Sequence, residues 1–176
     1  MKRNAKNLVY SALFAALCCV ATYALTIPLP YGYFNLGDVF VLLAGWCLGP
    51  IYGVAAAAVG SALADLLSGY ALYAPVTFVI KGVVAWLACE LYNALKKPFK
   101  THRFSFIARI IAAIVGELFM VFGYFVYECI LYGIAGGVLS VVGNCLQGLF
   151  SMICATLLVH LLFSIKPLRS LFPKLQ

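Results

Sequence analysis

The sequence predicts an all-α membrane protein, a single bundle of six transmembrane helices with both termini on the cytoplasmic side. Of its 176 residues, 65% are hydrophobic and only 10% are charged, and the mean hydropathy is +1.07. A soluble domain carries about 25% charged residues. Because a helix needs roughly 20 apolar residues to cross the hydrocarbon core, residues 1–176 have room for a bundle of this size and for no second domain. The composition excludes an ordinary soluble domain, a disordered tail and a disulfide-stapled secreted module.

The net charge of +7 comes from basic residues that gather in three places along the chain. One group precedes the first apolar run, one lies in the middle, and one follows the last run. Basic residues mark cytoplasmic loops, so both termini are expected inside, which requires an even number of crossings. Separated clusters that bracket apolar runs also argue against nucleic acid as a partner. The groups are Lys2, Arg3 and Lys6; Lys96, Lys97, Lys100, Arg103 and Arg109; and Lys166, Arg169 and Lys174.

Six apolar segments are separated by prolines, glycines and short polar loops. Pro28 and Pro30 end the first segment, since proline cannot continue a helical hydrogen-bond ladder. The second segment reaches only about 20 Å as a helix, so it is short, tilted or partly re-entrant. A turn at Ala135-Gly136-Gly137 separates the last two. The predicted segments are 8–27, 36–48, 50–67, 75–95, 105–132 and 137–165.

Ionisable side chains inside a membrane segment are functional hypotheses by default, because charge is expensive in hydrocarbon. Asp65 and Lys81 lie roughly 7–9 Å below the outer ends of neighbouring antiparallel segments. Their opposite charges are therefore expected to meet or to face one cavity. The alternative is a purely structural ion pair, or a lysine that extends to the outer headgroups.

Polar side chains in the last two segments follow helical spacing. Glu117, Tyr124 and Glu128 share one helix face, and Asn144 and Gln147 share another at comparable depth. Asp38 is expected with Asn35 at the mouth of this interior, at a helix N-terminus, which suits a carboxylate. Several polar groups at one depth favour a pocket that opens outward over simple interhelical hydrogen bonds, which contribute about 0.6 kcal/mol each. The predicted binding residues are Asn35, Asp65, Lys81, Glu117, Tyr124, Glu128, Asn144 and Gln147.

No motif for catalysis, a cofactor or a metal site is present. The chain lacks a P-loop, a G-x-S-x-G elbow and an H-E-x-x-H pair. Its seven cysteines form no C-x-x-C pair, so they are interpreted as small apolar residues. The sequence therefore predicts a protein that is not an enzyme, and any transport against a gradient would take its energy from partners or ions.

Residues 35–82 carry a resemblance to a known family. The motifs are NLGD at 35–38, LGP at 48–50, GSALADLLSGY at 60–70, YAPVT at 73–77 and IKG at 80–82. They resemble the substrate-binding S components of energy-coupling factor (ECF) vitamin transporters. Within that group, the chain is most similar to the branch that handles pyridoxine-type or hydroxymethylpyrimidine-type precursors, or riboflavin.

The resemblance implies a binding subunit of the plasma membrane that captures a vitamin or precursor from outside. It further implies a transmembrane coupling subunit and two ATP-binding subunits as partners. The spacing of Ala12 and Ala16 fits the small-residue surface by which such subunits dock on the coupling subunit. Tyr124, with Tyr31, Tyr33 and Tyr73, is expected to stack on a flat ring. A small independent transporter or an oligomeric channel remains the alternative, although apolar inner helix halves and the lack of an inverted repeat argue against both.

Overall fold

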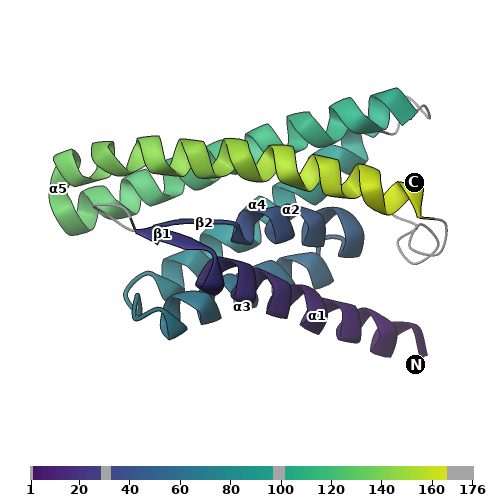
Figure 1. Cartoon of the computed structure of the whole chain (residues 1–176), viewed down its shortest axis with the longest axis horizontal. Coiled ribbons are helices and arrows are strands. Elements are labelled where there is room, and N and C mark those ends of the chain that lie inside the picture. The colour runs from purple at the N-terminus through teal and green to yellow at the C-terminus, as the bar shows by residue number, and fades with distance from the viewer. Residues whose placement is uncertain (1, 29–32, 97–101, 166–176) are drawn as a thin grey trace.

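A computed structural model of the chain describes residues 2–28, 33–96 and 102–165. Within these residues the protein is almost entirely helical, with one small antiparallel hairpin, as Figure 1 shows. The predicted all-α class is confirmed. The elements are α1 (Lys2–Ala24), β1 (Thr26–Pro28), β2 (Tyr33–Asn35), α2 (Gly37–Leu48), α3 (Tyr52–Leu67), α4 (Ala74–Lys96) and α5 (His102–Ser164).

Helix α2 forms the centre of the bundle. It contacts α1, α3, α4 and α5, and it lies between α1 and α5 in Figure 1. Every α2 residue except Phe40 is buried. At 1.5 Å per residue its 12 residues reach about 18 Å, which is too short to cross a bilayer. The other helices surround α2, so this short apolar segment is stable because protein rather than lipid covers it.

Helix α5 bends back on itself at Gly133, where the backbone has φ 76° and ψ 174°. The chain forms two antiparallel arms there, one from His102 to the bend and one from the bend to Ser164 (Figure 1). A positive φ favours glycine because it has no Cβ. The sequence placed this turn at 135–137, which is two to four residues too late. Gly137 instead lies close to Cys129 of the first arm. A side chain at position 137 would collide with the first arm.

The sequence predicted six separate helices. This number is not confirmed, because the described residues form five helices, of which α5 has two arms. Three of them are long and apolar enough to span a membrane: α1, α4 and α5. The start of α1 and both ends of α5 lie at the same end of the bundle, opposite the bend (Figure 1). The cytoplasmic position of both termini stays a prediction.

The first predicted segment ends earlier than expected. Helix α1 stops at Ala24, and residues 26–28 pair as a strand with residues 33–35, with Thr26 opposite Asn35. This hairpin extends toward the bend end of the bundle (Figure 1). It brings Asn35 directly to the start of α2.

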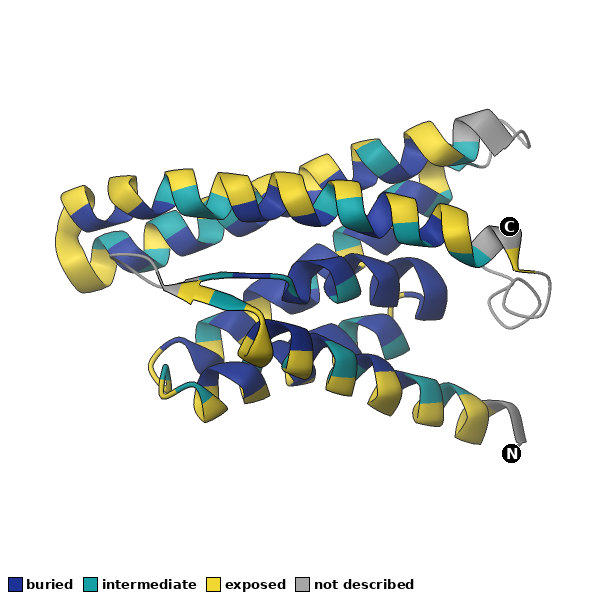
Figure 2. Cartoon of the chain, viewed as in Figure 1, coloured by how far each residue is buried: buried dark blue, intermediate teal, exposed yellow. Residues whose placement is uncertain are grey.

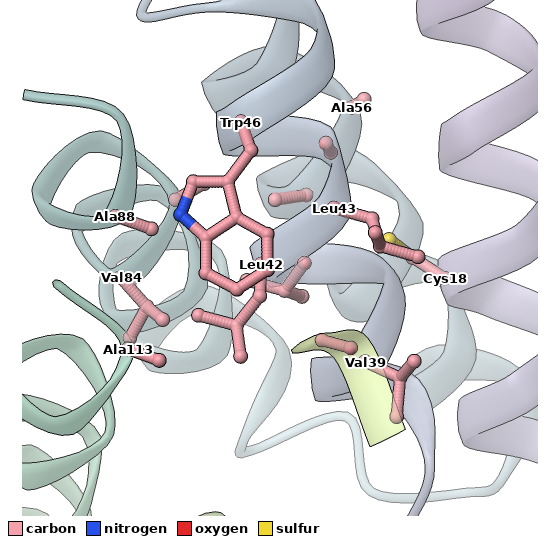
Figure 3. Packing of buried hydrophobic residues seen from close by; sticks show 14 of the residues in the cluster. Cys18, Val39, Leu42, Leu43, Trp46, Ala56, Val84, Ala88 and Ala113 are labelled. Atoms are coloured by element: carbon pink, nitrogen blue, oxygen red, sulfur yellow. The ribbon is translucent and has the colours of Figure 1, made fainter. Parts of the chain in front are cut away.

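The core is apolar and closely packed, and the outer surface is apolar as well. Trp46 of α2 lies against Val84 and Ala88 of α4, as Figure 3 shows. A Cβ on Gly45 would lie 2.4 Å from the carbonyl oxygen of Ala85, so α2 and α4 approach more closely than a side chain would allow. Figure 2 shows exposed residues along the outward faces of α1 and α5, and many of these residues are large and hydrophobic. Such a surface is typical of a protein that lies in lipid.

Candidate functional site

A buried ion pair joins α2 to α4. Lys81 Nζ lies 2.6 Å from Asp38 Oδ1 and 2.8 Å from Oδ2. Lys81 is 4% exposed and Asp38 is fully buried. Asp38 belongs to the first turn of α2, where free backbone N–H groups favour a carboxylate. Met120 Sδ on α5 also accepts a hydrogen bond from Lys81 Nζ at 2.9 Å. In an apolar interior each charge depends on the other, because an unpaired ion there is very costly.

Gln147 ties the ion pair to the hairpin. Its amide nitrogen donates to Asp38 Oδ2 at 2.5 Å. Its amide oxygen accepts from the backbone N–H of Asn35 at 2.9 Å and from the Asn35 side-chain amide at 3.1 Å. Asn35 Oδ1 in turn accepts from the Gly37 N–H at 2.8 Å. Elements β2, α2, α4 and α5 therefore meet at one polar point, which we name the Lys81 cluster: Asn35, Asp38, Lys81, Met120 and Gln147.

A second polar layer lies between the Lys81 cluster and the bend. Thr77 Oγ1 and the Tyr124 hydroxyl are 2.9 Å apart. The Tyr73 hydroxyl donates to Glu128 Oε1 at 3.3 Å and lies 3.5 Å from the Tyr132 hydroxyl. The two layers touch where Lys81 Nζ lies 5.3 Å from the centre of the Tyr124 ring. We name this layer the tyrosine layer: Tyr73, Thr77, Tyr124, Glu128 and Tyr132.

The structure brings most of the predicted binding residues together. Asn35, Lys81 and Gln147 belong to the Lys81 cluster. Tyr124 and Glu128 belong to the tyrosine layer. The sequence favoured Asp65 as the carboxylate that Lys81 meets, whereas the ion pair of Lys81 described above is made with Asp38. Asp65 is buried on α3.

The remaining predicted residues make no hydrogen bond with either layer in the described part of the chain. Glu117 is buried, and neither of its carboxyl oxygens has a hydrogen-bond partner in the described part of the chain. Asn144 is half-buried and makes no hydrogen bond with any described residue. Ala12 and Ala16 are exposed on α1. Tyr31 and the side chain of Tyr33 lie outside the described residues.

Sequence reasoning missed Thr77, Met120 and Tyr132, and it missed the pairing of Asp38 with Lys81. A signal was present for one of them, since Tyr73, Thr77 and Lys81 recur every four residues and so lie on one helix face. Asp38 was placed at a helix start at the mouth of the pocket, and not opposite Lys81. Methionine carries no polar pattern, so Met120 had no signal in the sequence.

The two layers offer the chemistry needed to recognise a polar ring compound. They supply one cation, carboxylate and amide acceptors, amide and hydroxyl donors, and aromatic rings. No group of three His, Cys, Asp or Glu side chains among residues 2–28, 33–96 and 102–165 is arranged to hold a metal ion. The fold and this interior define a helical membrane protein with charged and amide side chains buried in its bundle.

A comparison with protein families identifies the chain more closely. A model of the ECF-type riboflavin transporter S component family matches residues 2–164, and the chain belongs to this family. It is therefore a substrate-binding subunit of ECF transporters, a membrane protein of vitamin uptake and not an enzyme. The resemblance noted in the sequence is confirmed.

Two individual proteins are similar to the chain. An S component of a bacterial ECF transporter, described by its structure and mechanism, superposes with a TM-score of 0.68 at 24% sequence identity, over 92% of this chain and 97% of that one. This likeness shows the fold. An uncharacterized Pyrococcus woesei protein is 32% identical over 140 residues, which are 76% of this chain and 86% of that protein.

Proposed function

We propose that the chain binds riboflavin, or a similar vitamin or precursor such as pyridoxine or hydroxymethylpyrimidine, captured from outside the cell. The observation that carries the proposal is the meeting of charged and amide side chains from β2, α2, α4 and α5 inside an otherwise apolar bundle. Such groups are costly in hydrocarbon unless a function requires them. The family name supports riboflavin as the first candidate.

The tyrosine layer and the Lys81 cluster suit different parts of such a ligand. Tyrosine rings stack on a flat heteroaromatic system, and stacked aromatic pairs contribute about 0.5–1.5 kcal/mol beyond their buried area. Amide, carboxylate and ammonium groups bind ring nitrogens, carbonyl oxygens and hydroxyl groups. Asn144, half-buried and without a hydrogen bond among the described residues, is assigned to the same site.

Delivery into the cell is assigned to partners. A transmembrane coupling subunit and two ATP-binding subunits would supply the energy, since the chain has no nucleotide-binding motif of its own. The chain is placed in the plasma membrane as a multi-pass protein with both termini inside. The three long apolar helices and the basic clusters support this placement.

Riboflavin binding is tested with the purified chain in detergent. Flavin fluorescence is expected to fall when the ring stacks on Tyr124. Replacing Tyr124 by leucine should raise the Kd about tenfold, whereas Tyr124→Phe should keep most of the affinity. Tyr92→Phe is the matched control, because Tyr92 lies on α4 outside the tyrosine layer and its hydroxyl is bonded to the hydroxyl of Ser105. If riboflavin, pyridoxine and hydroxymethylpyrimidine all fail to bind by fluorescence and calorimetry, the proposal is wrong.

Docking on the coupling subunit is tested at the surface of α1. The exposed Ala12 and Ala16 leave room for close helix–helix approach. The double change Ala12→Leu and Ala16→Leu should abolish copurification with the coupling subunit and leave vitamin binding unchanged. Ala24→Leu, at an exposed alanine near the end of the same helix, is the control and should copurify normally. Normal copurification of the double variant would rule out this surface.

A further inference from the structure

One basic side chain serves the half of the bundle that lies toward the bend of α5. Lys81 is the only lysine or arginine between residues 7 and 95, and residues 110–165 contain neither. The segments that join α1 to α2, α3 to α4 and the two arms of α5 contain no lysine, arginine or histidine. Arg109 lies about 16 Å along α5 from Met120, which contacts Lys81. A ligand that enters from the bend end therefore meets Lys81 as its only lysine or arginine.

Carboxyl groups outnumber this cation in the interior. Asp65 and Glu128 interact electrostatically with Tyr124 of the tyrosine layer. Glu117 interacts in the same way with Asp38 and Lys81. The carboxyl groups therefore border both layers in which the ligand is placed. Four of the five acidic residues of the chain are buried, and they are Asp38, Asp65, Glu117 and Glu128.

Asp38 neutralises the two positive features that could hold an anion. Its two carboxylate oxygens lie 2.6 Å and 2.8 Å from Lys81 Nζ. Its place in the first turn of α2 also puts its negative charge where free backbone N–H groups favour an anion. One side chain thereby compensates both the ammonium group of Lys81 and the N-terminus of α2.

A phosphate group is disfavoured in this interior whichever carboxyl groups carry a proton. A phosphate monoester has a charge of about −1.5 to −2 at pH 7. If Asp65, Glu117 and Glu128 are ionised, they repel that charge. If they are protonated, the neutral pair of Lys81 and Asp38 still offers no cation to the phosphate, and a buried anion without a cation is very costly.

We propose that Asp38 makes the site selective for the unphosphorylated form of its ligand. The proposal rests on the proposed function, and it applies to riboflavin, pyridoxine and hydroxymethylpyrimidine alike, because each has a hydroxyl group that can carry a phosphate. Phosphate esters outside the cell must then be hydrolysed before uptake. In that reaction the oxygen of water bonds to phosphorus, the bond from phosphorus to the ester oxygen breaks, and the ester oxygen takes a proton. The free alcohol and inorganic phosphate result, so a phosphate-monoester hydrolase precedes this protein in the supply of its ligand.

The test compares each free compound with its phosphate ester on the purified full chain in detergent. The pairs are riboflavin, pyridoxine and hydroxymethylpyrimidine with their monophosphates, and calorimetry gives each Kd. Riboflavin 5′-phosphate should bind at least about 100-fold more weakly than riboflavin, since binding brings like charges together. Riboflavin 5′-acetate adds bulk at the same oxygen without charge, and it should bind within about tenfold of riboflavin.

The variant Asp38→Asn tests the residue itself. It frees the ammonium group of Lys81 for a phosphate, so the Kd of riboflavin 5′-phosphate divided by that of riboflavin should fall about tenfold. This ratio is the readout because the change also weakens the binding of riboflavin. Glu90→Gln is the matched control, at an exposed carboxylate near the other end of α4, and it should leave the ratio unchanged.

The outcomes separate this proposal from the proposed function. If riboflavin 5′-phosphate binds as tightly as riboflavin, or riboflavin 5′-acetate as weakly as the phosphate, exclusion by charge is overturned and the proposed function stands. An unchanged ratio in a folded Asp38→Asn chain overturns the role of Asp38. The unmodified chain decides the exclusion even if that variant does not fold. If none of the free compounds and none of the esters binds, the proposed function itself is wrong.

Discussion

Replacing Lys81 by methionine is expected to destabilise the folded protein by about 3–5 kcal/mol. Methionine keeps most of the length of the side chain but removes the ammonium group, with its charge and its N–H donors. Asp38, which is fully buried, then loses its cation at 2.6 Å and keeps an uncompensated negative charge in the centre of the bundle. The loss would appear as a lower midpoint of denaturation in detergent micelles.

The double variant Asp38→Asn with Lys81→Met distinguishes a structural pair from a binding pair. Removing both charges of a buried pair is often neutral or stabilising, so the double variant should recover most of the stability. It should still fail to bind riboflavin, because the cation and the carboxylate are assigned to the ligand. Lys96→Met is the control at a half-buried lysine over the Tyr92 ring, with an expected change of about 1 kcal/mol or less. A double variant as unstable as Lys81→Met would contradict this account.

The sequence predicted the helices and the polar interior because both depend on local patterns. Apolar runs between prolines and glycines mark the segments, and polar residues at helical spacing mark the inward faces. Burial of Lys81, Glu128 and Gln147 follows directly, since lipid leaves them no other place. The structure agrees with the sequence at this level, although the extent of the first segment and the position of the last turn differ.

Pairing between helices was not predictable from the same patterns. Helix α2 is buried on nearly every side, so it has no amphipathic period that would show which way Asp38 points. The sequence therefore matched Lys81 with Asp65 on the neighbouring helix by depth alone. Glu117 shows a related limit. Its spacing places it on one face with Tyr124 and Glu128, yet only the tertiary structure shows that it packs against Gly148 on the other arm of α5.

The bend of α5 shows why turns between apolar helices are hard to locate. Three glycines lie within five residues, at 133, 136 and 137. Only Gly133 has a positive φ, whereas Gly137 makes close contact with Cys129. Backbone freedom and close packing both select glycine, so composition alone does not separate the two uses.

Replacing Gln147 by leucine should weaken both the fold and the substrate site. The change removes one hydrogen-bond partner from each of three groups: the Asn35 backbone N–H, the Asn35 side-chain amide and Asp38 Oδ2. Unsatisfied buried groups cost about 1–3 kcal/mol each, and partial relaxation makes a total loss of about 2–4 kcal/mol the expected result. The amide of Asn35 should also exchange with solvent faster, because β2 loses its bond to α5.

Asn144→Leu provides the matched comparison on the same arm of α5. Asn144 lies one turn before Gln147, is half-buried and has no hydrogen bond to lose among the described residues. Its replacement should change stability by no more than about 0.5 kcal/mol and should lower riboflavin affinity, since Asn144 is assigned to the ligand. Denaturation midpoints and riboflavin titrations on both variants give four numbers. Gln147→Leu should lower both stability and riboflavin affinity, because the Gln147 amide is bonded to the protein. Asn144→Leu should lower only riboflavin affinity, because the Asn144 amide is assigned to the ligand.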